Sequence, residues 1–276
     1  MKTVVSIAGS DSSGGAGIQA DLKTMIMNGV YGMTVITAIT AQNTTGVRSV
    51  LEIPPEMIAD QIHAVWEDIP PDAVKIGMIP SAAAGTCIAD ALEQLRPAHL
   101  VVDPVMVATS GAALSDSGSV EVLRNRLLPL AEIMTPNIPE AQVLSGLTIR
   151  SREDMKQAAR LLQRTFGGAV LVKGGHAVED ASDVLCTGET LVCLEGERIP
   201  NPNTHGTGCT LSSAIASQLA KGESIETAVR LAKAYISDAL RVMMDLGKGS
   251  GPLCHHFALL TPSDDREKNP QKGESI

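Results

Sequence analysis

The chain has 276 residues, a formal net charge of −9 and only 2% aromatic residues. Nucleic acids bind to basic surfaces, and single strands stack on aromatic side chains, so this composition argues against a nucleic-acid partner. The five cysteines show no Cys-x-x-Cys spacing, which predicts reduced thiols rather than a disulfide framework or a zinc site. No apolar run approaches the ~18 residues that span a bilayer. We therefore expect a cytoplasmic protein without a membrane partner.

Short β-branched runs alternate with segments of helical periodicity along most of the chain. Strands are predicted at residues 3–8, 31–41, 47–53, 73–76, 100–102, 132–134, 169–172, 182–186 and 190–194. Helices are predicted at residues 18–28, 54–67, 81–95, 117–128, 139–144, 151–164, 207–220 and 224–245. This alternation predicts one α/β domain over residues 1–260, with a mostly parallel sheet and helices on both faces. Residues 261–276 are charged and nearly free of apolar side chains, which predicts a disordered tail.

Polar residues follow several of the predicted strands. Because the carboxyl ends of parallel strands meet at one edge of the sheet, these residues are expected to converge there. The set is Asp21, Gln42, Met78, Asp103, Asn137, Lys173 and Cys209. The glycine-rich residues 9–17 after the first strand match neither the Rossmann nor the Walker pattern, which disfavours a dinucleotide-dependent oxidoreductase.

Residues 203–210 read Asn-Thr-His-Gly-Thr-Gly-Cys-Thr and directly precede a predicted helix. Gly206 and Gly208 allow a tight turn whose N–H groups face one hollow, and the helix dipole adds positive potential there. Such a hollow stabilises the charge of a phosphoryl group in transfer. Cys209 lies in the first helical turn, where we expect the thiol pKa to be lowered. A plain turn with a buried cysteine is the competing interpretation.

Seven segments resemble the hydroxymethylpyrimidine/phosphomethylpyrimidine kinases, which are members of the ribokinase-like superfamily. In chain order they begin with Ala-Gly-Ser-Asp-Ser-Ser-Gly-Gly-Ala-Gly at residues 8–17, continued to residue 23, and Ala-Gln-Asn-Thr at 41–44. Lys-Ile-Gly-Met at 75–78, Asp-Pro-Val-Met at 103–106 and Thr-Pro-Asn-Ile-Pro-Glu at 135–140 follow. Lys-Gly-Gly-His at 173–176 and Thr-His-Gly-Thr-Gly-Cys-Thr at 204–210 complete the set. The resemblance covers residues 3 to about 257.

The resemblance implies an ATP- and Mg²⁺-dependent kinase of thiamine biosynthesis with the ribokinase-like fold, and suggests a homodimer. Its substrate would be 4-amino-5-hydroxymethyl-2-methylpyrimidine and then the monophosphate. Carried over by position, the substrate residues would be Gln42, Asp21, Gly9, Met78 and Val105. Cys209 would be the candidate base, with Gly206, Thr207 and Gly208 as the anion hole. Lys173, Asn137, Glu140 and Asp103 would lie at the nucleotide, with Glu140 and Asp103 on Mg²⁺, directly or through water.

Three positions depart from the usual patterns. Cys209 stands where the superfamily at large has an aspartate base, Thr109 where the family often has lysine, and Ser250 where it usually has histidine. A pyridoxal or pyridoxine kinase of the same architecture is the alternative function. A non-catalytic ligand sensor is a further alternative, disfavoured because Cys209, Lys173 and Glu140 are all present.

Overall fold

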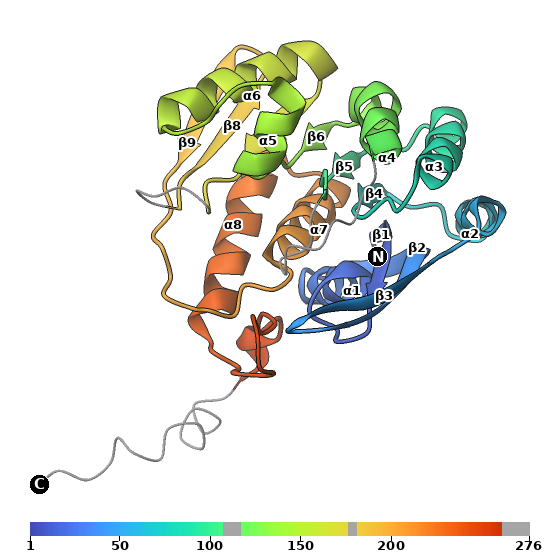
Figure 1. The fold of residues 1–276 in the computed structure, drawn as a ribbon, viewed down its shortest axis with the longest axis horizontal. Helices are drawn as coiled ribbons and strands as arrows, with labels where there is room; N and C mark the ends of the chain where they lie inside the picture. Colours follow the sequence, from blue (N-terminus) through green and yellow to red (C-terminus); the bar gives the residue numbers. More distant parts are fainter. Residues whose placement is uncertain (107–116, 176–180, 261–276) are drawn as a thin grey trace, which may run out of the picture.

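A nine-stranded sheet runs through the computed structural model, which describes residues 1–106, 117–175 and 181–260 (Figure 1). The strand order is β3-β2-β1-β4-β5-β6-β7-β8-β9. The strands from β2 to β7 are parallel, whereas β3, β8 and β9 pair antiparallel at the two edges. Their bounds are β1 Thr3–Asp11, β2 Tyr31–Asn43, β3 Gly46–Glu52, β4 Ala73–Ile76, β5 Leu100–Val102, β6 Ile133–Met134, β7 Ala169–Val172, β8 Asp183–Thr187 and β9 Thr190–Leu194. The predicted mostly parallel sheet is confirmed.

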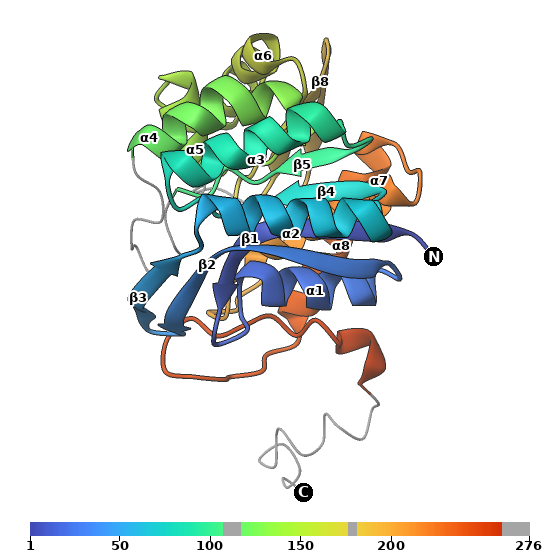
Figure 2. The same cartoon turned by 90° about the vertical axis from the view of Figure 1, so that its right-hand side faces the viewer.

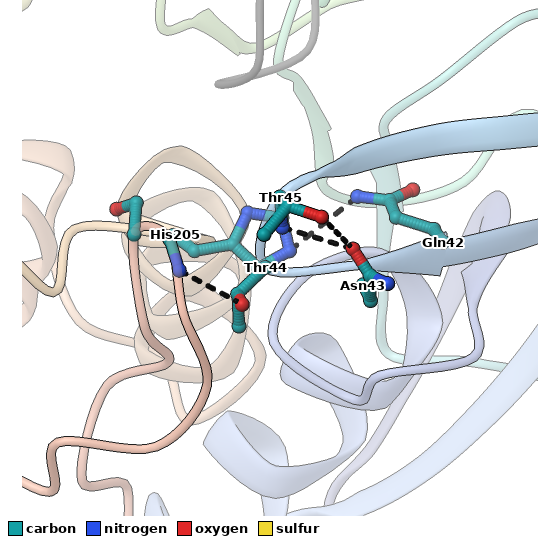
Figure 3. A pocket seen from close by; sticks show the side chains of 7 residues that line it. Gln42, Asn43, Thr44, Thr45 and His205 are labelled. Atoms are coloured by element: carbon teal, nitrogen blue, oxygen red, sulfur yellow. Dashed lines mark hydrogen bonds between the residues drawn. The ribbon is translucent and has the colours of Figure 1, made fainter.

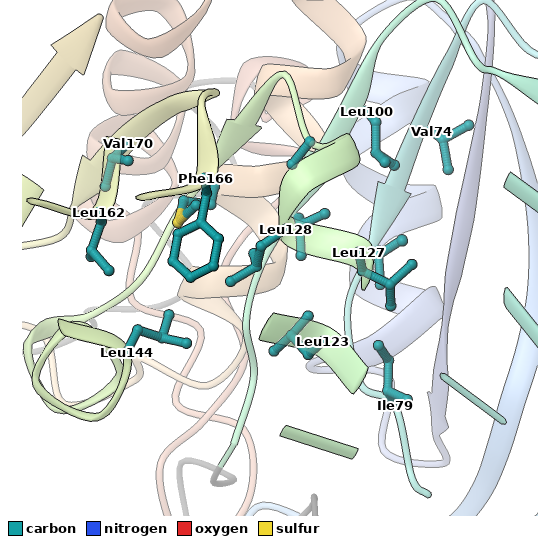
Figure 4. Close-up of a cluster of buried hydrophobic side chains, with 14 of the residues drawn as sticks. Val74, Ile79, Leu100, Leu123, Leu127, Leu128, Leu144, Leu162, Phe166 and Val170 are labelled. Atoms are coloured by element: carbon teal, nitrogen blue, oxygen red, sulfur yellow. The ribbon is translucent and has the colours of Figure 1, made fainter. Parts of the chain in front are cut away.

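Helices cover both faces of this sheet (Figure 2). Their bounds are α1 Gly17–Met27, α2 Pro55–Asp68, α3 Ala82–Leu95, α4 Ser117–Val122, α5 Ile138–Ser145, α6 Arg152–Phe166, α7 Thr207–Ala220 and α8 Ile225–Arg241. One apolar core lies between the sheet and α2 to α6 (Figure 4), and a second lies between the sheet and α1, α7 and α8. Alternate strand residues serve the two cores: Leu100 and Val102 enter the first, and Val101 enters the second.

Two predicted elements were wrong at their ends. Strand β1 continues to Asp11 instead of stopping before Gly9, because Ser10 and Asp11 still pair with β2 beyond a register shift. The helix predicted to reach residue 245 ends at Arg241, since Val242 is extended.

The helix predicted over residues 117–128 is not uniform. It is α-helical only to Val122, π-helical over Leu123–Leu127 and 3₁₀-helical over Leu128–Leu130. Pro129 lacks an N–H group and crowds the preceding turn, which accounts for the change of helix type. Among the described residues, none of the helices is both long and apolar enough to cross a bilayer. The predicted tail, residues 261–276, lies outside the described part of the chain.

Candidate active site

The N-terminus of α7 forms the predicted hollow. Gly206 precedes the helix in a left-handed conformation (φ 85°), and a Cβ there would lie 1.9 Å from the carbonyl oxygen of Gly15. Only glycine allows this close approach between the two glycine-containing loops. The Thr207 N–H bonds to Thr204 O within the turn (3.3 Å), and no side chain caps the helix. The amides of Gly208 and Cys209 therefore supply the positive end of the helix.

An ion pair from two strand ends faces this hollow. Lys173 Nζ, after β7, lies 2.8 Å from Asp103 Oδ1, after β5, and Thr135 Oγ1 donates to the same oxygen at 3.0 Å. A Cβ on Gly208 would lie 3.2 Å from Asp103 Oδ2 and 3.4 Å from Lys173 Nζ. Burial lowers the pKa of Lys173, but Asp103 and Glu140 outweigh it and raise the pKa above its usual value. The cation thus stays charged beside the amides that face an anion.

Asn137 and Glu140 form the start of α5 next to Lys173. Their side chains make a reciprocal capping box: Glu140 N donates to Asn137 Oδ1 at 2.9 Å, and Asn137 N donates to Glu140 Oε2 at 2.8 Å. The backbone of Asn137 bridges to that of Lys173. Burial raises the pKa of Glu140 to about 7, although the charge of Lys173 opposes the shift. Direct contact of Asn137 with a nucleotide stays a prediction, because its side-chain oxygen caps the helix.

The carboxylates in this region fit a magnesium ion better than a protein-enclosed metal centre. Asp103 Oδ2 faces Gly208, and Glu140 is a buried carboxylate whose pKa is influenced by both Lys173 and Asp103. Within the described ranges, no three His, Cys, Asp or Glu residues are grouped to hold a metal. Mg²⁺ is commonly held by one or two carboxylates together with substrate phosphates and water, which is what Asp103 and Glu140 offer.

The prediction of a lowered thiol pKa at Cys209 was wrong. Burial raises the pKa of Cys209 to about 11, and the positive charge of Lys75 only partly offsets this effect. The first-turn position alone favours a thiolate, but Asp21 and Asp103 add negative potential and so favour the neutral thiol. Cys209 is therefore a neutral thiol at pH 7.

Asp21 does not line the site, contrary to the prediction. Its carboxylate is completely buried and bonds to Lys75 Nζ (2.8 and 3.0 Å), Ser6 Oγ (2.5 Å) and Ser213 Oγ (2.7 Å). Both oxygens are therefore engaged by the protein. Asp21 and Lys75 instead hold α1, β1, β4 and α7 together beneath the site.

The remaining predicted substrate residues lie at the same carboxyl edge. Gly9 and Met78 are adjacent, because a Cβ on Gly9 would lie 2.9 Å from the Met78 sulfur. Val105 is half-buried after β5, and its N–H bonds to Asp103 O at 2.8 Å. Their contact with a substrate stays a prediction.

Gln42 lines a hollow of about 340 Å³ between the β2–β3 turn and the loop before α7 (Figure 3). Asn43, Thr44, Thr45, His205, Gly249 and Ser250 line the rest. The Ser250 hydroxyl accepts from Thr204 N at 3.1 Å, so the segment with the unusual serine closes this hollow.

His205 was missed as a functional residue by sequence reasoning. Its Nε2 atom lies 2.8 Å from Asp11 Oδ2 and 3.4 Å from the Gln42 amide. Burial raises the pKa of Asp11, but hydrogen bonds from His205, from Ser13 and from two backbone amides bring it to about 2. The only signal in the sequence was the position of His205 directly before Gly206.

These elements together define the class of the protein. The carboxyl edge of a mostly parallel α/β sheet brings an uncapped helix N-terminus, a charged lysine and two carboxylates to one place. This arrangement suits the transfer of a phosphoryl group to a small molecule, as in the ribokinase-like kinases.

The sequence comparisons identify the family. The family model described as phosphomethylpyrimidine kinase matches residues 11–254. A hydroxymethylpyrimidine/phosphomethylpyrimidine kinase from Rhizobium meliloti is 50% identical over 257 residues, which cover 92% of this chain and 96% of that protein. The thiamine biosynthesis bifunctional protein ThiED from Geobacter sulfurreducens is 49% identical over 96% of this chain, which spans only 54% of that relative. The chain belongs to the phosphomethylpyrimidine kinase family of phosphotransferases.

Solved structures support the same assignment. The phosphomethylpyrimidine kinase of Clostridium difficile superposes with a TM-score of 0.79 at 48% identity, covering 87% of this chain and 99% of that chain. A pyridoxal kinase of Bacillus subtilis in complex with ADP superposes with a TM-score of 0.87 at 38% identity, covering 95% and 100%. The fold is thus shared with both kinds of kinase, whereas the sequence is more similar to the pyrimidine kinase.

Proposed function

We propose that this chain is an ATP- and Mg²⁺-dependent kinase of 4-amino-5-hydroxymethyl-2-methylpyrimidine and then of its monophosphate, within thiamine diphosphate biosynthesis. The observation that carries the proposal is the Asp103–Lys173 pair facing Gly208 at the N-terminus of α7. The names of the family and of the most similar relatives support the substrate.

The residues at the N-terminus of α7 and in the Gln42 pocket have different roles in phosphoryl transfer. The amides of Gly208 and Cys209 and the cation of Lys173 neutralise the charge of the phosphoryl group. Mg²⁺ held by Asp103 and Glu140 would supply further positive charge at the phosphates. Gln42 offers a donor and an acceptor to the edge of an aminopyrimidine.

Cys209 acts as a neutral group in this proposal. A thiol with a pKa of about 11 is not ionised at pH 7 and cannot serve as a preformed base. Phosphoryl transfer passes through a loose transition state, in which positioning and electrostatics matter more than early proton removal. We therefore propose that Cys209 orients the substrate hydroxymethyl group towards the anion-binding amides at the N-terminus of α7.

A pyridoxal kinase is the second candidate function, favoured by the superposition on the Bacillus subtilis pyridoxal kinase. ATP consumption with the pyrimidine alcohol and with pyridoxal, compared as kcat/KM, separates the two. We expect the pyrimidine alcohol to be preferred. A preference for pyridoxal by tenfold or more, about 1.4 kcal/mol, would reverse the substrate assignment.

The two phosphorylation steps and the assembly are tested separately. Phosphorus NMR of the products distinguishes a monophosphate from a diphosphate, and a mixture that stops at the monophosphate contradicts the second step. We also propose a cytoplasmic location, in line with five cysteines that form no disulfide. A homodimer is proposed from the family resemblance. Light scattering after size-exclusion chromatography measures the mass, and a value of one chain contradicts the dimer.

A further inference from the structure

Four side chains lie in a row beside the Gln42 hollow. Thr40 and Gln42 lie at the end of β2, where the pairing with β3 shifts register between Ala41 and Gln42, and their side chains are neighbours. The Oε1 position of the Gln42 amide lies 3.1 Å from Thr40 Oγ1, and the Nε2 position lies 3.4 Å from His205 Nε2. His205 Nε2 in turn lies 2.8 Å from Asp11 Oδ2. Rotating the Gln42 amide by 180° exchanges its oxygen and its nitrogen between Thr40 and His205.

The His205 end of the row determines which amide atom fits there. An ionised carboxylate only accepts hydrogen bonds, and the pKa of Asp11 is lowered to about 2, mainly by the bond from His205 against the effect of burial. His205 Nε2 therefore carries a proton and donates it to Asp11. A protonated ring nitrogen cannot accept a hydrogen bond, so an amide N–H group pointing at it would be mismatched.

The Thr40 end leads to the same answer independently. The Thr40 hydroxyl has one proton, and Ser10 O, at 2.9 Å, is its nearer acceptor. With that proton committed, Thr40 Oγ1 can only accept from the group that lies 3.1 Å away. An amide oxygen there would be mismatched, whereas an amide N–H group forms a hydrogen bond.

We propose that Asp11, His205 and Thr40 are positioning residues that hold the Gln42 amide with its oxygen towards His205 and its nitrogen towards Thr40. In this orientation an amide N–H donates to Thr40 Oγ1, and no amide N–H points at the ring N–H of His205, whose single proton is already donated to Asp11. It leaves the second amide N–H group and the amide oxygen for a ligand in the hollow, at fixed places.

The fixed amide selects a ring by the order of its polar groups, an inference that rests on the proposed function. A 4-aminopyrimidine presents an amino donor beside a ring-nitrogen acceptor, which pairs with an amide that offers oxygen and N–H in matching order. The 4-oxo analogue presents a carbonyl acceptor beside a ring N–H donor, the reverse order. The three positioning residues thus determine the preference for amino over oxo rings.

The amide orientation is measurable without substrate or turnover. In the full chain labelled with ¹⁵N-glutamine, the Gln42 side-chain signal is identified by its loss in Gln42→Ala. We expect cross-relaxation from its amide protons to the Thr40 methyl group. Cross-relaxation to the His205 ring protons in its place would overturn the proposal.

Kinetics test the consequence for specificity. We expect the wild-type protein to prefer the 4-aminopyrimidine alcohol over its 4-oxo analogue by about 100-fold in kcat/KM, because a site that forms hydrogen bonds to the ring rejects a ring with mismatched groups. Thr40→Val removes the acceptor beside the amide, and His205→Phe removes the N–H donor while keeping a ring against Gly15. Each should bring the preference below about tenfold, through KM more than kcat.

Thr34→Val is the matched control, since Thr34 lies half-buried in the same strand away from the hollow. It should keep the full preference. If the Thr40→Val and His205→Phe variants fold and also keep the full preference for the amino ring, the positioning role is wrong. The kinase assignment would still stand. A protein that phosphorylates neither alcohol contradicts the proposed function, while the NMR measurement still decides the amide orientation.

Discussion

Lys75 Nζ lies 2.8 Å from Asp21 Oδ2, and neither side chain is exposed to solvent at all. Burial lowers the pKa of Lys75, but the charge of Asp21 outweighs it, and the pKa is raised. Ser6 and Ser213 donate to the same carboxylate. The pair therefore connects β4 and α1 to β1 and α7, and both of its charges influence the pKa of Cys209.

Asp21→Asn should lower the free energy of unfolding by about 3–5 kcal/mol, because it leaves the buried Lys75 charge without its partner. Urea unfolding followed by circular dichroism measures the change. Lys2→Met is the matched control, since it breaks the exposed Lys2–Asp72 pair and should cost less than about 1 kcal/mol. Equal losses in the two variants would contradict the role given to the buried pair.

Cys209 should ionise only in alkaline solution. Its folded pKa of about 11 lies above the ordinary value of 9.0, so the folded state holds the proton more tightly than the unfolded state. The stability linked to this thiol is present below pH 9 and is lost as the pH rises from 9 to 11. The difference in thiolate absorbance near 240 nm between wild type and Cys209→Ala should appear only above about pH 10. Its appearance below pH 8 would restore the interpretation of Cys209 as a base.

Gly208→Ala should impair catalysis without weakening the fold. The added methyl group would lie 3.2 Å from Asp103 Oδ2 and 3.4 Å from Lys173 Nζ, where the phosphoryl group is expected. We expect kcat/KM for ATP to fall about 100-fold, as for the loss of an anion-stabilising group. The thermal midpoint should stay or rise, because alanine favours a helix over glycine. Ser217→Ala, further along α7, should keep kcat/KM, and a similar loss there would point to a general disturbance of the helix.

Glu140→Gln should raise the Mg²⁺ concentration needed for half-maximal rate about tenfold, by removing one anionic ligand. The amide oxygen of glutamine can still accept from Asn137 N, so the capping box is retained. In wild type, protons compete with Mg²⁺ for a carboxylate of pKa about 7, so the required concentration should fall between pH 6 and 8.

Asp154→Asn offers a matched control for Glu140→Gln. It alters the equivalent capping box of α6, which is exposed and has no part in the proposed site. Its Mg²⁺ requirement should equal that of wild type. An unchanged requirement in Glu140→Gln would remove Glu140 from the magnesium site.

Most of the sheet was predictable because its strands are short β-branched runs between helices with clear start signals. The capping box at Ser151, expected from the sequence, is present with both hydrogen bonds. The change from α-helix to π-helix before Pro129 was not predicted, because the spacing of hydrophobic residues cannot distinguish the two helix types. The closeness of Asp103 and Lys173 followed from the rule that the carboxyl ends of parallel strands meet at one edge of the sheet.

The electrostatics of the site could not be predicted in the same way. Asp21 was assigned from its expected place at the sheet edge and from the family resemblance, and the pKa of Cys209 from its position in the first helical turn. The structure buries Asp21 in an ion pair with Lys75, and burial raises the pKa of Cys209. Asp11 and His205 are 194 positions apart, and no local pattern relates them. Such pairs depend on how segments remote in the chain pack together.

The strand order has a consequence for biosynthesis. Strands β1, β2 and β4, which adjoin one another next to the edge strand β3, are complete once residue 76 has been made. Helix α7 packs against α1, β1, β4 and β5, yet starts only at Thr207. A nascent chain that ends before that point contains these strands but lacks the anion-binding N-terminus of α7. We therefore expect such a truncated chain not to hydrolyse ATP.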